Sequence, residues 1–390
     1  MKFLSQQNIK KIILAMNNFL YIDDNTRDEA DGLIVGLSDE KLSIEFRNPT
    51  GNWENERIKF LSEEFRKYDG LLLDLNLEEK KNPESGTISY YKGSTLAQEL
   101  RNLSKSKEMS EIPIFLLSAN KNLDKYFDET NKDLFDLIIS KESLSGSDAF
   151  KTYTRKLIAI AEAYKFLSGS KDVNSILNSE TDNEDVRFIS EMEYQVRTKP
   201  LHSISNFFIK EILQKNGILI CENLLFSRLG IDLDASAEEH VATLKDKILI
   251  KIKYEGIFSS GWERWWMSKL EKLWNEISEN RTLRSLDAQE RVEILNKRFN
   301  LDLKASKKDG KAKSSKFWTF CKGTGTYIDN IDGLLVIGQE KIYPWQDKEY
   351  ICFEEALQPT NKEIWKDIIE SEKIKLEMLK RKFPNERPSR

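Results

Sequence analysis

Residues 70–76 read GLLLDLN, a short apolar run that ends in Asp74 and Asn76. The run has the length of a strand and no polar alternation, which is typical of a strand buried on both faces of a parallel sheet. Four similar runs lie at Phe19–Ile22, Leu42–Phe46, Ile112–Leu117 and Leu134–Ile139. Amphipathic helical patterns alternate with them over Thr26–Leu37, Glu54–Lys67, Ser94–Ser104, Asn122–Phe127 and Asp148–Phe166. The alternation predicts an α/β fold with a five-stranded, doubly wound parallel sheet.

Composition limits the class of protein. A chain of 390 residues is too long for one ordinary core, so we expect two or three domains. The formal net charge of −4 gives no general attraction to nucleic acid or to anionic membranes. The longest apolar runs, such as IPIFLL at 112–117, are far shorter than the ~18 residues expected of a membrane span.

The N-terminus and the cysteines indicate a cytoplasmic protein. Residues 1–18 have helical spacing and no small-residue cleavage site, so they predict a helix and not a signal peptide. Cys221, Cys321 and Cys352 are too few and too scattered for a disulfide framework. With only two histidines to join them, a four-ligand zinc site is not expected either.

The second half of the chain differs in kind from the first. A segment rich in Ser, Asp and Asn at 168–186 predicts a linker, and no βαβ rhythm follows it. Helical periodicity then dominates 201–215, 222–229, 262–279 and 286–299. We therefore predict an α/β domain at 1–167, the linker at 168–186, a mainly helical domain at 187–300, and a last part at 301–390 with a Lys-rich loop, a small β element and a charged helix.

Reactive side chains follow four of the five predicted strands. Asp23 and Asp24 end the first strand, Asp74 the third, Ser118 the fourth and Lys141 the fifth. In an open α/β sheet, functional groups gather at the carboxyl ends of the strands. We therefore expect these five side chains to meet at one edge of the sheet.

Crowded carboxylates at that edge predict a metal site. Asp23, Asp24 and Asp74 would repel one another by roughly 1–4 kcal/mol per pair at 4 Å, depending on the effective dielectric. A hard divalent cation, Mg²⁺ or Mn²⁺, relieves this repulsion and takes oxygen ligands. The backbone carbonyl of Asn76 is a further candidate ligand.

The same edge has the groups that phosphoryl transfer needs. Asp74 can act as the nucleophile and form an acyl phosphate, while the metal screens the incoming anion. Ser118 can hydrogen-bond one phosphoryl oxygen, and Lys141 can neutralise another. We expect no classical enzyme here, but at most phosphotransfer to Asp74 and its own dephosphorylation.

Four motifs make residues 20–166 resemble the receiver domain of response regulators in two-component signalling. They are YIDD at 21–24, LLLDLN at 71–76, LLSA at 116–119 and IISK at 138–141. The resemblance implies a receiver or flavodoxin-like fold, Mg²⁺ binding and a sensor histidine kinase as partner. The alternative is a degenerate receiver, or a flavodoxin-like domain with accidental acids at its edge.

Three departures from the receiver pattern concern the output switch. Ile138 stands where the family usually has an aromatic residue, Glu142 stands where it usually has proline, and EEKKNPESGTISYY at 78–91 is inserted. The resemblance therefore implies intact acceptor chemistry with an altered switch. Asn76 and Asn120 would flank the approach of a hydrolytic water and could orient it, which predicts rapid turnover of the phosphoryl group. The alternative is that both residues only form loops.

The sequence of the C-terminal half allows several interpretations. ENLLFSRLGID at 222–232 could begin a helix-turn-helix, but the helix expected from Ala235 carries EEH and few basic residues, whereas a DNA-reading helix presents Arg, Lys, Asn or Gln. The Lys-rich run at 304–316 predicts a solvated, mobile loop. Four tryptophans at helical spacing within 254–274 predict a packed core or an interface anchor. They are Trp262, Trp265, Trp266 and Trp274.

A second resemblance rests on ENLLFSRLGID, GWERWW, FWTFC and YPWQDKEYI. These segments resemble atypical receiver proteins of bacterial phage-defence operons, of the Detocs type. The resemblance implies a histidine kinase partner, a separate effector protein and a role as a phosphate sink. From the residues themselves, neither a nucleic-acid nor a membrane partner is expected. Two alternatives stay open, a DNA-binding response regulator and an effector with an enzymatic C-terminal domain, and so does oligomerisation.

Overall fold

The structure is a computed structural model that describes residues 16–82, 86–182, 184–308, 310–339, 342–358 and 367–383. The side chains of residues 124–126 and 129 are also outside the description. Most of the helix predicted for residues 1–18 therefore lies outside the described residues. None of the described helices is both long and apolar enough to cross a membrane.

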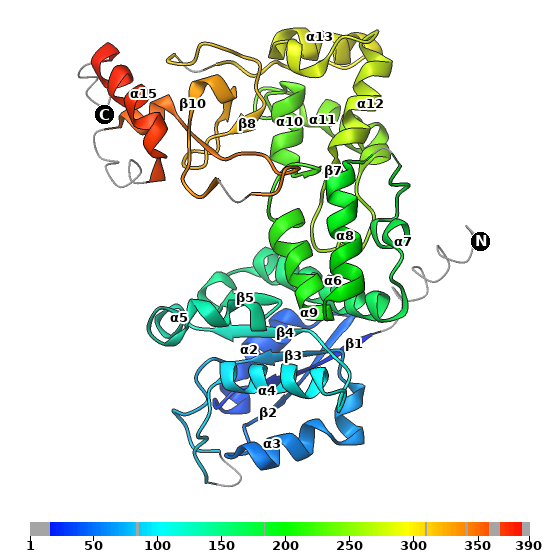
Figure 1. The fold of residues 1–390 in the computed structure, drawn as a ribbon, viewed down its shortest axis with the longest axis vertical. Helices are drawn as coiled ribbons and strands as arrows, with labels where there is room; N and C mark the ends of the chain where they lie inside the picture. Colours follow the sequence, from blue (N-terminus) through cyan, green and yellow to red (C-terminus); the bar gives the residue numbers. More distant parts are fainter. Residues whose placement is uncertain are drawn as a thin grey trace. The chain divides into compact units, whose positions relative to one another are not determined.

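The predicted five-stranded parallel sheet is confirmed. Its strand order is β2-β1-β3-β4-β5, and every neighbouring pair is parallel. This is the doubly wound order of flavodoxin-like and receiver-like folds, with its switch point between β1 and β3. The strands are β1 (Asn17–Ile22), β2 (Leu42–Arg47), β3 (Gly70–Leu73), β4 (Ile114–Ser118) and β5 (Leu137–Ser140), shown in blue to cyan-green in Figure 1.

Helices cover both faces of this sheet. Leu71 and Leu73 of β3 belong to an apolar cluster that also contains Phe60 and Leu96 from two helices on that face. The side chain of Leu72, which points to the opposite face, is also fully buried. The helices of this part are α2 (Arg27–Leu37), α3 (Trp53–Phe60), α4 (Gly93–Lys105), α5 (Asn120–Tyr126) and α6 (Ser147–Gly169).

The compact unit that contains the sheet is larger than the predicted domain. It takes in residues up to Asp182, together with Ile189–Ile209 and Glu255–Trp262. The segment predicted as a linker contains the short helix α7 (Val173–Leu177), whose Ile176 and Leu177 are fully buried. Helices α8 (Val186–Thr198) and α9 (Leu201–Phe207) follow it. A Ser- and Asn-rich composition hides α7 because only its few apolar residues make buried contacts.

The second unit is mainly helical with small β elements, as predicted. Asn183–Phe188, Lys210–Tyr254 and Glu263–Arg390 form it. Its helices are α10 (Glu222–Leu229), α11 (Glu238–Lys247), α12 (Met267–Ile277), α13 (Ala288–Phe299), α14 (Phe353–Leu357) and α15 (Glu370–Lys382). Its two-stranded sheets pair β6 (Leu219–Ile220) with β7 (Trp265–Trp266), β8 (Thr319–Phe320) with β9 (Tyr327–Ile328), and β10 (Gly333–Leu335) with β11 (Tyr350–Cys352).

The tryptophan-rich segment is not one helix. Trp265 and Trp266 form β7, which pairs antiparallel with Leu219 and Ile220, and helix α12 begins only at Met267. The prediction of helix over 262–279 is therefore wrong for its first five residues, because strand pairing with β6 overrides the helical spacing. The side chains of Trp262, Trp265, Trp266 and Trp274 are all buried, as a packed core requires.

Helices α10 and α11 do not match a helix-turn-helix in length of turn. The end of α10 at Leu229 and the start of α11 at Glu238 are separated by a longer connection than the 3–4 residues usual for that motif. Gly230 adopts a left-handed φ of 73° at the end of α10. The first turn of α11 is acidic, with Glu238 and Glu239, which disfavours contact with phosphates.

Candidate functional site

The sheet register places the predicted residues at one edge. Ile22 of β1 pairs with Leu73 of β3, so Asp23 and Asp74 follow on neighbouring strands. The backbone N–H of Asp74 donates to the Ile22 carbonyl at 3.0 Å. Ser118 is the last residue of β4 and pairs with Ser140 of β5, directly before Lys141.

Lys141 joins the two acidic strand ends. Its Nζ lies 2.9 Å from Asp23 Oδ2 and 2.8 Å from Asp74 Oδ1. The side chains of Asp23 and Asp74 are only 1% and 6% exposed, and that of Lys141 is 20% exposed. We call these three residues the Lys141 cluster. It is a buried arrangement of two carboxylates around one ammonium group.

The two carboxylates of the Lys141 cluster are not equivalent. Burial alone would raise the pKa of Asp23. The Lys141 charge, the Tyr21 hydroxyl and the Asn25 N–H lower it by a larger amount, so the net pKa falls below its usual value. Burial raises the pKa of Asp74 to about 6, because Lys141 only partly offsets burial and the negative charge of Asp23. One cation thus serves two buried acids, and the cluster has an excess of negative charge.

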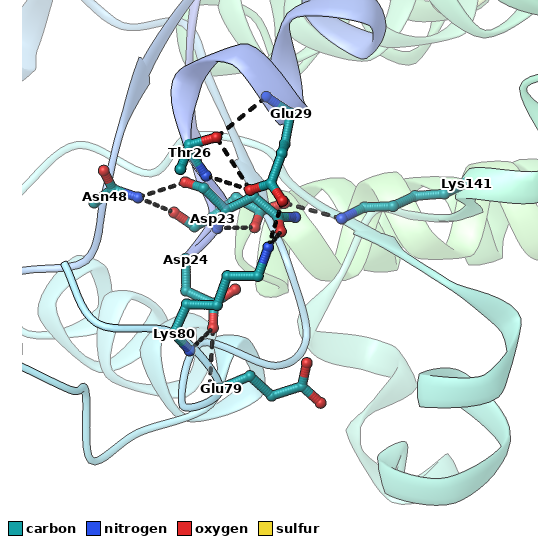
Figure 2. A network of polar contacts seen from close by, with 9 residues as sticks. Asp23, Asp24, Thr26, Glu29, Asn48, Glu79, Lys80 and Lys141 are labelled. Atoms are coloured by element: carbon teal, nitrogen blue, oxygen red, sulfur yellow. Dashed lines mark hydrogen bonds and ion pairs between the residues drawn. The ribbon is translucent and has the colours of Figure 1, made fainter. Parts of the chain in front are cut away.

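Asp24 faces a different part of the chain. Its Oδ2 accepts hydrogen bonds from the backbone N–H groups of Glu79 at 2.9 Å and Lys80 at 2.8 Å. Lys80 Nζ in turn donates to Asn25 Oδ1 and Glu29 Oε1, both at 2.7 Å. Figure 2 shows Lys141 reaching Asp23 from one side and the backbone of Glu79 and Lys80 meeting Asp24 on another. We call the Asp24 hydrogen bonds to Glu79 and Lys80 the insertion contact.

The insertion contact has no signature in the sequence, because loop residues carry no periodicity. Burial raises the pKa of Asp24, and the Lys80 and Glu79 N–H groups only partly offset this. Asn48, just after β2, was also missed. Its Nδ2 donates to the Asp23 carbonyl at 2.9 Å and to the Asn25 carbonyl at 2.7 Å, and so fixes the acidic loop. Its signal in the sequence is its position, since it is a polar residue after Leu42–Phe46, the predicted strand to which no site residue was assigned.

Gly93 fixes the end of the insertion. Its N–H donates to the Leu75 carbonyl at 3.0 Å, where helix α4 begins. A Cβ atom at this position would lie 2.1 Å from the Asp74 carbonyl oxygen. Only glycine allows the backbone to return this closely to the strand end that carries Asp74.

Ser118 has an unused hydrogen-bonding group. The residue is fully buried, and its Oγ has no hydrogen-bond partner among the described residues. A buried hydroxyl without a partner costs about 1–3 kcal/mol. An oxygen-rich ligand at the strand ends would satisfy it.

The two asparagines lie differently from each other. Asn76 Nδ2 donates to Glu79 Oε1 at 2.8 Å, and its backbone N–H donates to Asp74 Oδ2 at 2.7 Å. Asn120 is exposed, and its N–H donates to Glu142 Oε2 at 2.9 Å. Glu142 also accepts from Ser140 Oγ at 2.8 Å. The residue in the usual proline position therefore links the loops that follow β4 and β5.

Ile138, the residue in the usual aromatic position, is half-buried in β5. It packs against the apolar cluster of the α3 and α4 face. An aliphatic side chain here has no hydroxyl or ring edge to exchange between inward and outward positions.

The donor chemistry at the site suits a hard cation. Asp23, Asp24 and Asp74 supply carboxylate oxygens, and burial, together with the nearby charge of Asp23, raises the pKa of Asp24 and Asp74. These acids are not gathered into one ligand set, since the described residues contain no group of three or more His, Cys, Asp or Glu side chains placed to hold a metal. Asp24 is turned to the insertion instead.

Comparisons with known proteins give weak similarities. No protein-family model and no curated protein matches the chain significantly. A sensor protein from Polaromonas sp. JS666 is 16% identical, with a TM-score of 0.26 over 37% of this chain and 98% of the other.

Two response regulators are similar at the same level. RcsB from Salmonella enterica serovar Typhimurium, solved with promoter DNA and a phosphomimetic, is 16% identical with a TM-score of 0.24 over 50% of this chain and 99% of its own. LqsR from Legionella pneumophila is 16% identical with a TM-score of 0.27 over 61% of this chain and 76% of its own. At these TM-scores the matches add no argument to the sheet topology described above.

Proposed function

We propose that this chain is the receiver protein of a two-component-like signalling system and accepts a phosphoryl group on Asp74 from a sensor histidine kinase. The observation that carries the proposal is the contact of buried Asp74 with Lys141 at 2.8 Å, beside a strand whose last residue, Ser118, has a buried hydroxyl with no partner in the described part of the chain. Both groups suit a phosphoryl oxygen.

The chemistry follows from these positions. An oxygen of Asp74 attacks the phosphorus of a phosphohistidine, and an acyl phosphate forms on Asp74. The P–N bond breaks, and the imidazole of the kinase is the leaving group. Lys141 is held in its charged form, since the charges of Asp74 and Asp23 raise its pKa against the effect of burial. The Lys141 ammonium group can therefore exchange its contact with the Asp74 carboxylate for a contact with a phosphoryl oxygen. Ser118 Oγ donates to another oxygen.

A divalent cation completes the charge balance in this proposal. Asp23, Asp24, Asp74 and the Asn76 carbonyl would hold Mg²⁺, or Mn²⁺ in its place, and the ion would screen the phosphoryl charge from Asp74. The Asp24 carboxylate already has two backbone donors, so the ion competes with the insertion contact for it.

The finer role we propose is a phosphate sink in phage defence, with a separate effector protein. It is supported by the altered switch, since Ile138 lacks an aromatic ring and Glu142 ties the loops after β4 and β5 together. Rapid dephosphorylation is part of this role. Replacing Asn76, whose amide now contacts Glu79, tests it: Asn76→Ala is expected to lengthen the lifetime of the acyl phosphate.

Acetyl phosphate tests the acceptor without a known kinase. With Mg²⁺ present, wild type is expected to gain one alkali-labile phosphoryl group by intact mass, and Asp74→Ala none. Asp31→Ala is the matched control, because its side chain is 54% exposed on α2. A sensor histidine kinase autophosphorylated with ATP is the second donor. Equal modification of wild type and Asp74→Ala, or no modification by either donor, would overturn the proposal.

A further inference from the structure

Two cysteines far apart in sequence are neighbours in the C-terminal unit. Cys321 directly follows β8 and pairs in a parallel bridge with Tyr350, two residues before Cys352 at the end of β11. The backbone N–H of Cys352 donates to Cys321 Sγ at 3.2 Å, across 31 residues of sequence. The two side chains also interact, since each shifts the pKa of the other. The Cys321 sulfur atom therefore lies beside Cys352.

The pair lies beneath an exposed turn. Cys321 and Cys352 are 0% and 3% exposed, while residues 322–326 between β8 and β9 are exposed. Thr324 Oγ1 in this turn lies 4.0 Å from Cys352 Sγ. Gly325 has a left-handed φ of 73°, and a Cβ atom there would meet nothing within 4 Å. Local opening of this turn gives a small oxidant access to both sulfurs.

The hydrogen bonds make the two thiols chemically different. The Cys352 thiol and backbone N–H both donate to Cys321 and lower its pKa, against the effect of burial. The same contact, together with burial, raises the pKa of Cys352. Cys321 is thus the better nucleophile, and Cys352 is the protonated partner.

We propose that Cys321 and Cys352 form a reversible disulfide when the protein meets a hydroperoxide. The Cys321 thiolate attacks one oxygen of the peroxide, the O–O bond breaks, and a sulfenic acid and hydroxide form. Cys352 sulfur then attacks Cys321 Sγ, the S–S bond forms, the S–O bond breaks, and water leaves with the thiol proton. The two thiols lose two electrons, and the peroxide is reduced.

The bond would act on the small β part of the C-terminal unit. Cys321 and Cys352 belong to one apolar cluster with Phe353 and Leu376 of the last two helices. A disulfide would fix the exposed turn to the start of α14. The contact of the Cys352 N–H with Cys321 Sγ at 3.2 Å brings the two residues within the reach of a disulfide.

The test is a thiol count on the full-length protein, with hydrogen peroxide as the probe. The reduced chain has three cysteine thiols, and peroxide is expected to leave one, on Cys221. Peptide mapping should then show a 321–352 linkage, and dithiothreitol should restore all three thiols. Three surviving thiols, or bonds between chains through Cys221, would overturn the proposal.

Single variants separate the roles of the two sulfurs. In Cys352→Ser, dimedone is expected to trap a sulfenic acid on Cys321, while Cys321→Ser should show no label on Cys352. Cys221→Ser is the control and should form the disulfide as wild type does. Equal labelling of both positions would contradict the assigned roles, and the wild-type peptide map decides the bond itself if a variant does not fold.

Discussion

Asp23 and Asp24 are adjacent in sequence, yet two different parts of the chain bind them. Asp23 shares the Lys141 ammonium group with Asp74, across 118 residues of sequence. Asp24 accepts backbone N–H groups of the insertion, 55 and 56 residues away. The Lys141 cluster has side chains that are at most 20% exposed, whereas the insertion contact joins a buried acid to a surface loop.

The two sets of contacts differ in how easily they can be broken. A buried ion pair is expensive to break, because removing one partner leaves a buried charge uncompensated. Backbone N–H groups of a loop can exchange a carboxylate for water with little loss. We infer that, in the unphosphorylated protein, the Lys141 cluster is the constant half of the site and the insertion contact is the exchangeable half.

Removing Lys141 should have the largest effect. Lys141→Met leaves Asp23 and Asp74 buried without their cation, so we expect a loss of about 3 kcal/mol in the free energy of unfolding in EDTA. Urea denaturation followed by circular dichroism measures it. Lys151→Met is the control, since the Lys151 side chain is 74% exposed. Equal stabilities of the two variants would show that the Lys141 cluster is not a buried ion pair.

Replacing Glu56, the α3 residue that binds Tyr91 at the end of the insertion, should have the next largest effect. The Glu56 carboxylate is fully buried and accepts from the Arg47 guanidinium at 2.6 Å, the Thr50 N–H at 2.7 Å and the Tyr91 hydroxyl at 2.6 Å. Glu56→Gln is expected to lose about 2 kcal/mol at pH 7, because a charged acceptor is lost. Glu54→Gln, at an exposed position of the same helix, is the control.

Acid should remove the same contribution in wild type. Burial alone would raise the pKa of Glu56. Arg47 and the other donors lower it by a larger amount, so the pKa of Glu56 in the folded protein lies below its pKa in the unfolded chain. Its contribution is therefore complete above the unfolded pKa of about 4.3 and is lost as pH falls through the folded pKa. The stability difference between wild type and Glu56→Gln should shrink between pH 5 and pH 3. A constant difference would contradict the ionised carboxylate.

Asp24 should affect local opening more than overall stability. Asp24→Ala is expected to raise hydrogen exchange at the Glu79 and Lys80 amides several-fold, with a change in unfolding free energy within about 1 kcal/mol, because burial of the carboxylate offsets its hydrogen bonds. Asp24→Asn keeps an acceptor and should lie between wild type and Asp24→Ala. Asp28→Ala, an exposed position, is the control.

Magnesium sharpens the same measurement. The Mg²⁺ site proposed above includes Asp24, so adding Mg²⁺ to wild type should also speed exchange at the Glu79 and Lys80 amides. The ion should leave the Asp24→Ala amides unchanged. Slower exchange at these amides with Mg²⁺ would show that the ion and the insertion contact coexist.

Lys80 should matter least. Its ion pair with Glu29 joins side chains that are 42% and 49% exposed. Such pairs are screened by salt and lose side-chain entropy on forming. Lys80→Ala is therefore expected to leave the urea midpoint unchanged at 0.15 M salt, with Glu29→Gln behaving alike. A clear shift in either variant would move Lys80 into the constant half of the site.

The sequence predicts the sheet and its edge well because both depend on local pattern. An unbroken apolar run fixes each strand, and a reactive residue directly after the run is placed by the strand itself, as for Asp74 and Lys141. The insertion contact could not be predicted, since backbone N–H groups carry no residue identity. Trp265 and Trp266 were misassigned because a two-residue strand is shorter than any usable period.

The disposition of the cysteines was hidden for a similar reason. Cys321 and Cys352 meet only because β8 and β11 lie side by side, and neither strand is long enough to be predicted. Three scattered cysteines predict no disulfide framework, and spacing alone cannot show that two of them are neighbours.

Gly93 gives the insertion a freedom that the rest of the site lacks. The backbone leaves the sheet after Asp74 and returns at Gly93, which packs against the Asp74 carbonyl and donates to the Leu75 carbonyl. Both ends of the inserted loop are therefore fixed at the same place. Doubling the length of such a loop adds only about 0.6 kcal/mol of closure entropy. Insertions and deletions between these two ends can therefore accumulate during evolution while Asp74 keeps its position.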